Sequence, residues 1–291
     1  MKKFNKPALI LILFFFIFTS ESIGKSFLWE IEVNGNKSYI LGSVHMMKKE
    51  VYPLKSELEE GFSRCDFLVV EADISTEKLG EILKITMEKA KYKNNSTLKD
   101  HISVNTYKIA SKKLDELGMS LKYFNNFKPW FLAMTVTSME LVKQGLDPNL
   151  GIDKYFINKA GDKKILELEG VEFQLDMFDN FSDAESDKFL LSSLRDATEL
   201  GKEIDTIVEA WKAGDTDAIE RLLIDNKKDF PGMEKLFKII LDERNERMVK
   251  KIESYFQTGD SYFIIAGAAH LVGKKGIIKM LEKKGYKLKQ I

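Results

Sequence analysis

Two strand-like segments near opposite ends of the chain each lead into the same pattern, Gly-x-x-His, and this pair limits the possible folds most strongly. Residues 37–41 lead into the first pattern at residues 42–45, and the apolar residues 261–266 lead into the second at residues 267–270. A third apolar run, residues 67–71, ends in an acidic segment. Short apolar runs of this kind predict buried strands. The simplest architecture therefore places strands from both ends of the chain in one central sheet.

Turn and helix signals predict the remaining elements. Asn34-Gly35 lies between two strand-like segments and predicts a hairpin, because both residues tolerate a positive φ. Helical spacing dominates from about residue 75 to residue 256, apart from a strand-like stretch at residues 163–169. A final helix is expected over residues 273–284 and a final strand over residues 286–291. This order favours an α/β (mixed α+β) fold with a central mixed sheet, whose site the helical middle caps.

The N-terminal segment is typical of a signal peptide. Basic residues precede an apolar run at residues 8–18, and Ser22-Ile23-Gly24 offers small residues for cleavage. We therefore divide the chain into a signal peptide, residues 1–24, and a single domain, residues 25–291. We expect export to the periplasm or secretion, with no stable membrane span after cleavage. The alternative is an uncleaved N-terminal anchor, although the apolar run is shorter than the about 20 residues that a span needs.

Composition and absent motifs exclude several classes of protein. The 45 basic residues balance the 45 acidic ones, so the chain lacks the basic surplus of a nucleic-acid-binding protein. Cys65 is the only cysteine, so neither an internal disulfide nor a thiolate metal cluster can form. No P-loop, Gly-x-Gly-x-x-Gly, Gly-x-Ser-x-Gly or His-Glu-x-x-His motif occurs, which argues against NTPases, dinucleotide enzymes, α/β-hydrolases and standard zincins.

The two strand-end histidines, His45 and His270, are the candidate metal ligands. Ligands of open α/β sheets bind beyond the carboxyl ends of the strands, and imidazole is the commonest protein ligand for metals. Gly42 and Gly267 let a bound substrate approach the backbone closely, so we predict that both contribute to substrate binding. Glu71 ends an apolar strand, where an unpaired carboxylate is costly, and is predicted as a metal ligand or a general base. The alternative is two ordinary loop histidines and a solvated strand end.

Three further residues are candidates for the same site. Glu169 ends the strand-like stretch at residues 163–169 and is predicted to bind substrate, with a half-exposed strand as the alternative. Arg244 and Asn245 lie within a helical stretch, where asparagine is unfavourable and invites a tertiary explanation. An arginine at the cleft could stabilise developing negative charge, so both are predicted as catalytic, with a solvated helix face as the alternative.

The ordered set of short motifs resembles the TraB/GumN family, which is related to the Tiki metalloproteases. The motifs are Leu28-Trp29-Glu30, Tyr39 to His45, Tyr52-Pro53-Leu54, Leu68 to Asp73, Lys128-Pro129-Trp130, Gly151-Ile152-Asp153, Leu168-Glu169 with Gln174, Trp211 to Asp215, Glu243-Arg244-Asn245 and Tyr262 to His270. The resemblance implies a protease dependent on Mn²⁺ or Co²⁺ that needs both Gly-x-x-His motifs and a glutamate. It also implies that Glu169, Arg244 and Asn245 belong to the site.

We therefore expect an exported metal-dependent hydrolase, most simply a peptidase that uses a metal-activated water. His45, His270 and Glu71 would hold the divalent metal, with Mn²⁺ or Co²⁺ favoured and Zn²⁺ possible. The substrate would be a peptide or a small molecule. The alternative is a non-catalytic protein of the same fold that binds a peptide or a tetrapyrrole. Sequence alone leaves the substrate, the resident metal and the oligomeric state open.

Overall fold

A computed structural model describes residues 24–194, 197–229 and 232–291. Apart from Gly24, the predicted signal peptide lies outside these residues. The centre is a six-stranded sheet in the order β4-β3-β5-β2-β1-β6. The strands are β1 (Leu28–Val33), β2 (Asn36–Ser43), β3 (Phe67–Val70), β4 (Lys164–Glu167), β5 (Tyr262–Gly267) and β6 (Leu288–Gln290). Strands β4, β3, β5 and β2 are parallel, and β1 pairs antiparallel with β2 and β6, which confirms the predicted mixed sheet.

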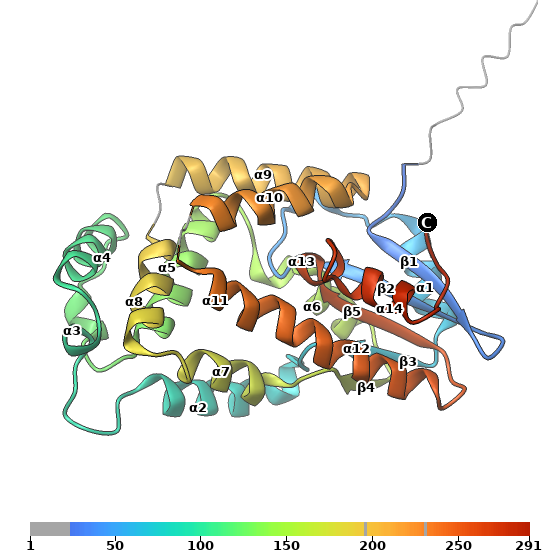
Figure 1. Cartoon of the computed structure of the whole chain (residues 1–291), viewed down its shortest axis with the longest axis horizontal. Coiled ribbons are helices and arrows are strands. Elements are labelled where there is room, and N and C mark those ends of the chain that lie inside the picture. Colours follow the sequence, from blue (N-terminus) through green and yellow to red (C-terminus); the bar gives the residue numbers. More distant parts are fainter. Residues whose placement is uncertain (1–23, 195–196, 230–231) are drawn as a thin grey trace, which may run out of the picture.

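The register of the sheet places the two Gly-x-x-His motifs side by side. In the β2–β5 pair, Gly42 lies opposite Ala266, and Ser43 lies opposite Gly267. Strand β3 pairs with the other edge of β5 and leads into Glu71. Because these strands are parallel, their carboxyl ends meet at one edge of the sheet. The chain therefore brings residues from its two ends to the same edge (Figure 1).

The predicted hairpin and buried strands are present for the expected physical reasons. Asn34 has a φ of 53° and Gly35 a φ of 82°, the left-handed values that a tight β1–β2 turn requires. All six residues of β5 are buried, as are the last three of β3. Parallel strands covered on both faces need such continuous apolar runs. The apolar pattern therefore identifies the central strands of the sheet.

Helices occupy most of the rest of the described chain. They are α1 (Ser56–Arg64), α2 (Leu79–Ala90), α3 (Leu98–His101), α4 (Val104–Glu116), α5 (Pro129–Lys143), α6 (Ile152–Asn158), α7 (Val171–Asp179), α8 (Asp183–Ser193), α9 (Ala197–Ala213), α10 (Thr216–Asp229), α11 (Glu234–Phe237), α12 (Glu243–Phe256), α13 (Ala268–Leu271) and α14 (Ile277–Lys283). A π-helical segment, Lys238–Asp242, joins α11 to α12. No helix within the described ranges is both long and apolar enough to cross a bilayer.

The helical middle packs in two ways. Helices α4, α5 and α8 share a hydrophobic cluster of their own, which includes Leu114, Val136 and Leu190. Figure 1 shows these helices at the end of the molecule opposite the sheet, while the α9–α10 pair reaches back from them toward it. Trp211 of α9 donates its indole N–H to the carbonyl oxygen of Gly42 at 2.6 Å, so this pair is fastened to the first Gly-x-x-His turn.

One predicted helix is shorter in the structure. The helix expected over residues 273–284 is present as α14, which starts only at Ile277, after a turn. Gly273 has a φ of 80°, which is incompatible with a right-handed helix. A Cβ on Gly276 would lie 2.3 Å from the carbonyl oxygen of Val272, so the chain is also closely packed on itself at this turn. The short α13 carries His270 directly after β5.

Candidate functional site

The two histidines are each held by an oxygen at Nδ1. His45 Nδ1 lies 2.8 Å from Asp153 Oδ2, and His270 Nδ1 lies 2.6 Å from Asn245 Oδ1. Because both partners are acceptors, each Nδ1 donates a proton, and Nε2 of the neutral ring carries the lone pair. Metal-binding imidazoles are commonly oriented by such a partner on the other ring nitrogen. The structure therefore gives both rings the tautomer that a metal ligand needs.

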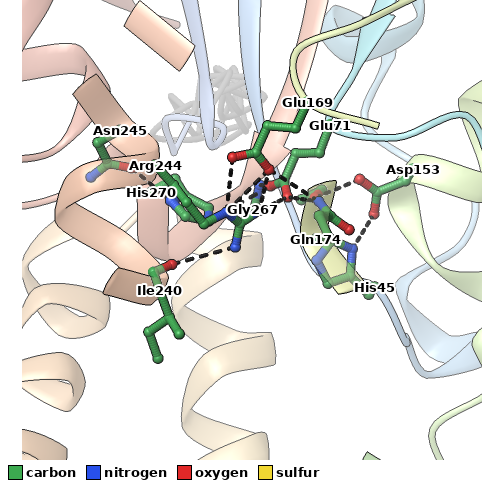
Figure 2. A network of polar contacts seen from close by, with 11 residues as sticks. His45, Glu71, Asp153, Glu169, Gln174, Ile240, Arg244, Asn245, Gly267 and His270 are labelled. Atoms are coloured by element: carbon green, nitrogen blue, oxygen red, sulfur yellow. Dashed lines mark hydrogen bonds and ion pairs between the residues drawn. The ribbon is translucent and has the colours of Figure 1, made fainter. Parts of the chain in front are cut away.

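Glu71 lies buried between the two motifs (Figure 2). Its Oε1 accepts the backbone N–H of Gly267 at 2.6 Å and lies 3.9 Å from His270 Nε2. Its Oε2 accepts from Arg244 Nη2 at 2.6 Å and from Gln174 Nε2 at 3.1 Å. One oxygen of the carboxylate thus faces the histidines while the other is held by cationic and amide groups.

A small space beside Gly267 is bordered by all three predicted ligands. A Cβ built on Gly267 would lie 3.3 Å from Glu71 Oε1, 3.5 Å from His270 Cδ2 and 3.8 Å from His45 Nε2. The predicted residues therefore converge on one point, as two parallel strands ending side by side require. Glycine at this position leaves the space between the side chains open.

Arg244 is the centre of a buried ionic network. Its Nε and Nη2 donate to Glu169 at 3.0 and 2.7 Å, and Nη2 also donates to Glu71. Nη1 donates to the carbonyl oxygen of Ile240, in the π-helical segment, at 3.3 Å. Gln174 bridges Glu71 and Glu169 with the same amide nitrogen. This arrangement compensates two buried carboxylates and fixes the direction of Glu71.

The network and burial shift the pKa values of three site residues. Burial lowers the pKa of His270 to about 4, so this ring is neutral at pH 7. Burial alone would raise the pKa of Glu71, but His270, His45 and Arg244 together lower it to about 2. Because His270 is neutral near pH 7, the lasting causes at this pH include the permanent charge of Arg244. Asp153 raises the pKa of His45, although the ring is 65% exposed and water limits that effect.

A cavity of about 260 Å³ opens beside the two histidines. Its floor is formed by the two Gly-x-x-His turns, including His45, Gly267 and His270. Helices α9 and α10 form its wall with Glu203, Ile207, Ile219, Leu222, Leu223 and Asn226. Gly42, Glu169, Arg244 and Asn245 are not among its lining residues. Helices of the helical middle therefore border the candidate substrate space, in agreement with the expected cap.

The contacts of Gly42, which was predicted to bind substrate, and of Asp73, which ends the motif of Glu71, are explained by packing and by loop structure. A Cβ on Gly42 would lie 2.2 Å from the ring of Phe27, so glycine is needed there for packing within the sheet. The carboxylate of Asp73 accepts the N–H of Ser75 and pairs with Lys78 at 3.0 Å. This carboxylate is therefore occupied in the loop after β3.

Sequence reasoning did not identify Asp153 as a site residue. Asp153 follows Gly151, whose missing side chain lets α6 start against the backbone of His45: a Cβ there would lie 2.2 Å from the carbonyl oxygen of His45. The buried Asp153 carboxylate then accepts from His45 and from Ser43 Oγ at 2.9 Å. The Gly-Ile-Asp motif was the available signal, but its spacing does not reveal its partner.

Two of the predicted ligands, His270 and Glu71, lie close enough to share one divalent ion. Two ligand atoms about 2.1 Å from one ion are at most about 4.2 Å apart, and His270 Nε2 and Glu71 Oε1 are 3.9 Å apart. In the part of the chain that the structure describes, no group of three or more His, Cys, Asp or Glu side chains is arranged so that it could hold a metal ion. An ion held here would therefore draw further ligands from water or substrate.

Comparison with known proteins places these motifs in a family. A profile described as the TraB/PrgY/gumN family matches residues 27–290. Uncharacterized proteins YbaP of Shigella flexneri and of Escherichia coli are each 29% identical over 160 residues, which is 53% of this chain and 58% of the relative. The chain thus spans little more than half the length of these two relatives.

A third relative extends over more of the chain. It is an uncharacterized protein of Treponema pallidum, 18% identical over 273 residues, which covers 88% of this chain and 80% of the relative. No solved structure matches the chain. The family profile, in contrast, extends from the start of the sheet to its last strand and includes both Gly-x-x-His motifs. The chain therefore belongs to the TraB/PrgY/gumN family.

Proposed function

We propose that the chain is an exported metal-dependent hydrolase that cleaves peptide bonds. The observation that carries this proposal is the paired orientation of the two imidazoles. Each Nδ1 donates to a fixed side-chain oxygen, and both rings border the space beside Gly267. Two ordinary loop histidines would not require this matched support from Asp153 and Asn245. The arrangement supports a shared metal site with an open side toward the cavity.

His45 and His270 would hold the ion through Nε2, with Glu71 as the carboxylate ligand. Bound there, Mn²⁺, Co²⁺ or Zn²⁺ supplies a Lewis acid and lowers the pKa of a water molecule. The low pKa of Glu71 favours the ligand role over the general-base role, because an effective base has a pKa near the working pH. The surroundings of this carboxylate therefore support the ligand role among the two that the sequence left open.

Arg244 and Asn245 act as positioning residues in this proposal. Arg244 donates to Glu71 and to Glu169, and Gln174 links the two carboxylates and completes the network. Asn245 also donates its side-chain amide to the carbonyl oxygen of Lys275 at 2.8 Å, which fixes the oxygen that receives His270 Nδ1. These contacts favour a role in orienting the metal ligands. The sequence had predicted a different role, direct catalytic contact with the substrate.

The cavity size does not favour the tetrapyrrole alternative. Sites for drug-sized ligands typically enclose about 300–1,000 Å³. The cavity beside His45 and His270 encloses about 260 Å³, which suits part of a peptide better than a whole macrocycle. A peptide-binding protein without catalysis remains the competing outcome of the experiment below.

The first experiment measures the metal content and Mn²⁺ affinity of the chain and of three histidine variants. His45→Ala and His270→Ala remove the two proposed ligands. His101→Ala is the matched control, because this third histidine pairs with Asp183 and stacks on Tyr92 away from the site. We expect one metal ion per chain in the parent and the control, and loss of the ion in the other two variants.

A peptide mixture analysed by mass spectrometry then tests turnover. We expect cleavage by the parent chain and by His101→Ala, with no cleavage by His45→Ala or His270→Ala. Circular dichroism and thermal melting establish that each variant is folded. Equal metal content in all four proteins would refute the shared site. Specific metal binding and peptide binding without turnover would support the non-catalytic alternative.

A further inference from the structure

The wall of the cavity beside the histidines is apolar, and it comes from the helical middle and not from the sheet. Ile207 of α9 and Ile219, Leu222 and Leu223 of α10 line it. Ile219 is buried, whereas Ile207, Leu222 and Leu223 are only half-buried. Half-buried apolar side chains that gather in a concave surface commonly mark a place where a ligand completes the burial.

Among the described residues that line the cavity, polar side chains occur both on its floor and on its wall. His45 and His270 belong to its floor, where the proposed chemistry takes place. Asn226 of α10 donates to Glu203 of α9 at 2.7 Å on its wall, which joins the two helices. The leucines and isoleucines supply the rest of the wall from the same two helices, and Ser43, Val44, Ala268 and Ala269 add to the floor. A group entering this space would therefore meet apolar side chains directly beside the reacting position.

We propose that this cavity is a specificity pocket that receives one apolar side chain of the peptide substrate, next to the bond that is cleaved. The inference rests on the proposed peptidase function and adds the class of residue that the enzyme selects. A volume of about 260 Å³ suits a side chain of the size of leucine, isoleucine or phenylalanine together with neighbouring backbone. A serine side chain would lose hydration against the isoleucine and leucine side chains of the wall.

The helices that form the pocket wall are attached to the two turns that carry the histidines. The indole of Trp211 binds the carbonyl oxygen of Gly42, so the end of α9 is fastened to the turn that leads to His45. Helix α10 packs on α13, the short helix that carries His270. The apolar wall is thus connected to both Gly-x-x-His motifs, and a bound side chain would be placed relative to both histidines at once.

A pair of α10 variants tests the pocket. Leu222→Asn places an amide in the wall, whereas Ile224→Asn changes a residue that is 44% exposed and does not line the cavity. Cleavage sites are first mapped with the Mn²⁺-loaded full-length chain. Matched peptides with leucine or serine at each position beside the cleaved bond are then compared by kcat/KM and by equilibrium binding.

We expect the parent chain to prefer leucine over serine at one position by about tenfold or more, as apolar pockets discriminate by small increments of this size. The preference should fall about tenfold in Leu222→Asn and remain in Ile224→Asn. Cleavage without any preference for an apolar residue, or a preference equal in both variants, would overturn the pocket and leave the peptidase proposal intact.

Binding separates the remaining outcomes. If no peptide is cleaved but leucine peptides bind more tightly than serine peptides, and Leu222→Asn abolishes the difference, the pocket stands and the peptidase proposal fails. If the parent chain neither cleaves nor distinguishes the peptides, both proposals are refuted. Thermal melting of both variants confirms that the comparison is made between folded proteins.

Discussion

Gly267→Ala should separate the function of the site from the stability of the fold. The residue has a φ of −51° and a ψ of 138°, which alanine adopts without strain. Its new methyl group would lie 3.3 Å from Glu71 Oε1 and within 4 Å of both His270 and His45. The carboxylate must therefore shift by a few tenths of an ångström, and the space between the three ligands is filled.

The expected effects of this substitution have opposite signs. Replacing glycine by alanine at a compatible position stabilises a protein by about 0.4–1 kcal/mol, because the unfolded chain loses conformational freedom. Displacing a side chain that orients metal ligands typically costs about 10- to 100-fold in metal affinity. We therefore expect an unchanged or slightly higher melting temperature together with a 10- to 100-fold weaker Mn²⁺ affinity, measured by calorimetric titration.

Gly42→Ala is the matched control at the other Gly-x-x-His motif. Its methyl group would meet the ring of Phe27 at 2.2 Å within the core, and such overpacking costs about 1–3 kcal/mol. This variant should lower the melting temperature while the folded protein keeps its metal affinity. Parent-like Mn²⁺ affinity in Gly267→Ala, with the fold intact, would refute the reasoning about the space between the ligands.

Two further perturbations test the support of the ligands. Asp153→Asn removes the charge that raises the pKa of His45. In the parent chain, protons compete with Mn²⁺ for His45, so the Mn²⁺ affinity should keep rising as the pH increases above 7. In the variant, the Mn²⁺ affinity should level off near the ordinary histidine pKa of about 6.5. Equal pH profiles of the Mn²⁺ affinity in the two proteins would contradict this explanation. Arg244→Met leaves Glu71 and Glu169 without a compensating charge, so urea unfolding at pH 7 should show a loss of about 3–5 kcal/mol. Arg244 contributes to the low pKa of Glu71, so the stability that this ion pair adds is complete above the ordinary glutamate pKa and is lost as the pH falls toward about 2. The loss of unfolding free energy in Arg244→Met should therefore shrink on acidification. A loss that is independent of pH would refute the ionic explanation.

The sheet could be predicted because its strands carry local signals. The apolar runs that became β3 and β5 are long enough to identify, and Asn34-Gly35 marks the turn of the β1–β2 hairpin. The late start of α14, at Ile277 and not at Gly273, could not be predicted from helical spacing alone. It depends on the left-handed backbone of Gly273 and on the close packing of Gly276, which are properties of the folded turn.

The convergence of the candidate ligands could be predicted for a different reason. Carboxyl ends of parallel strands share one edge, so two strand-end histidines and Glu71 were expected to meet there. Their partners were not predictable in this way. Asp153 reaches His45 from a helix that is distant in the sequence, and no periodicity connects the two. Gly42 was predicted to admit substrate, whereas the structure shows that its missing side chain makes room for Phe27.

The position of β5 in the sheet has a consequence for biosynthesis. This strand lies between β3 and β2, although it is among the last segments of the chain to be made. Until it is inserted, β2 and β3 have no partner between them, and Glu71 lacks the backbone N–H of Gly267 that it accepts in the finished fold. For most of its synthesis, the nascent chain therefore contains His45 and Glu71 but not His270, so the site is not yet assembled. Closing the sheet and completing the site are a single event, so a chain truncated before β5 has neither.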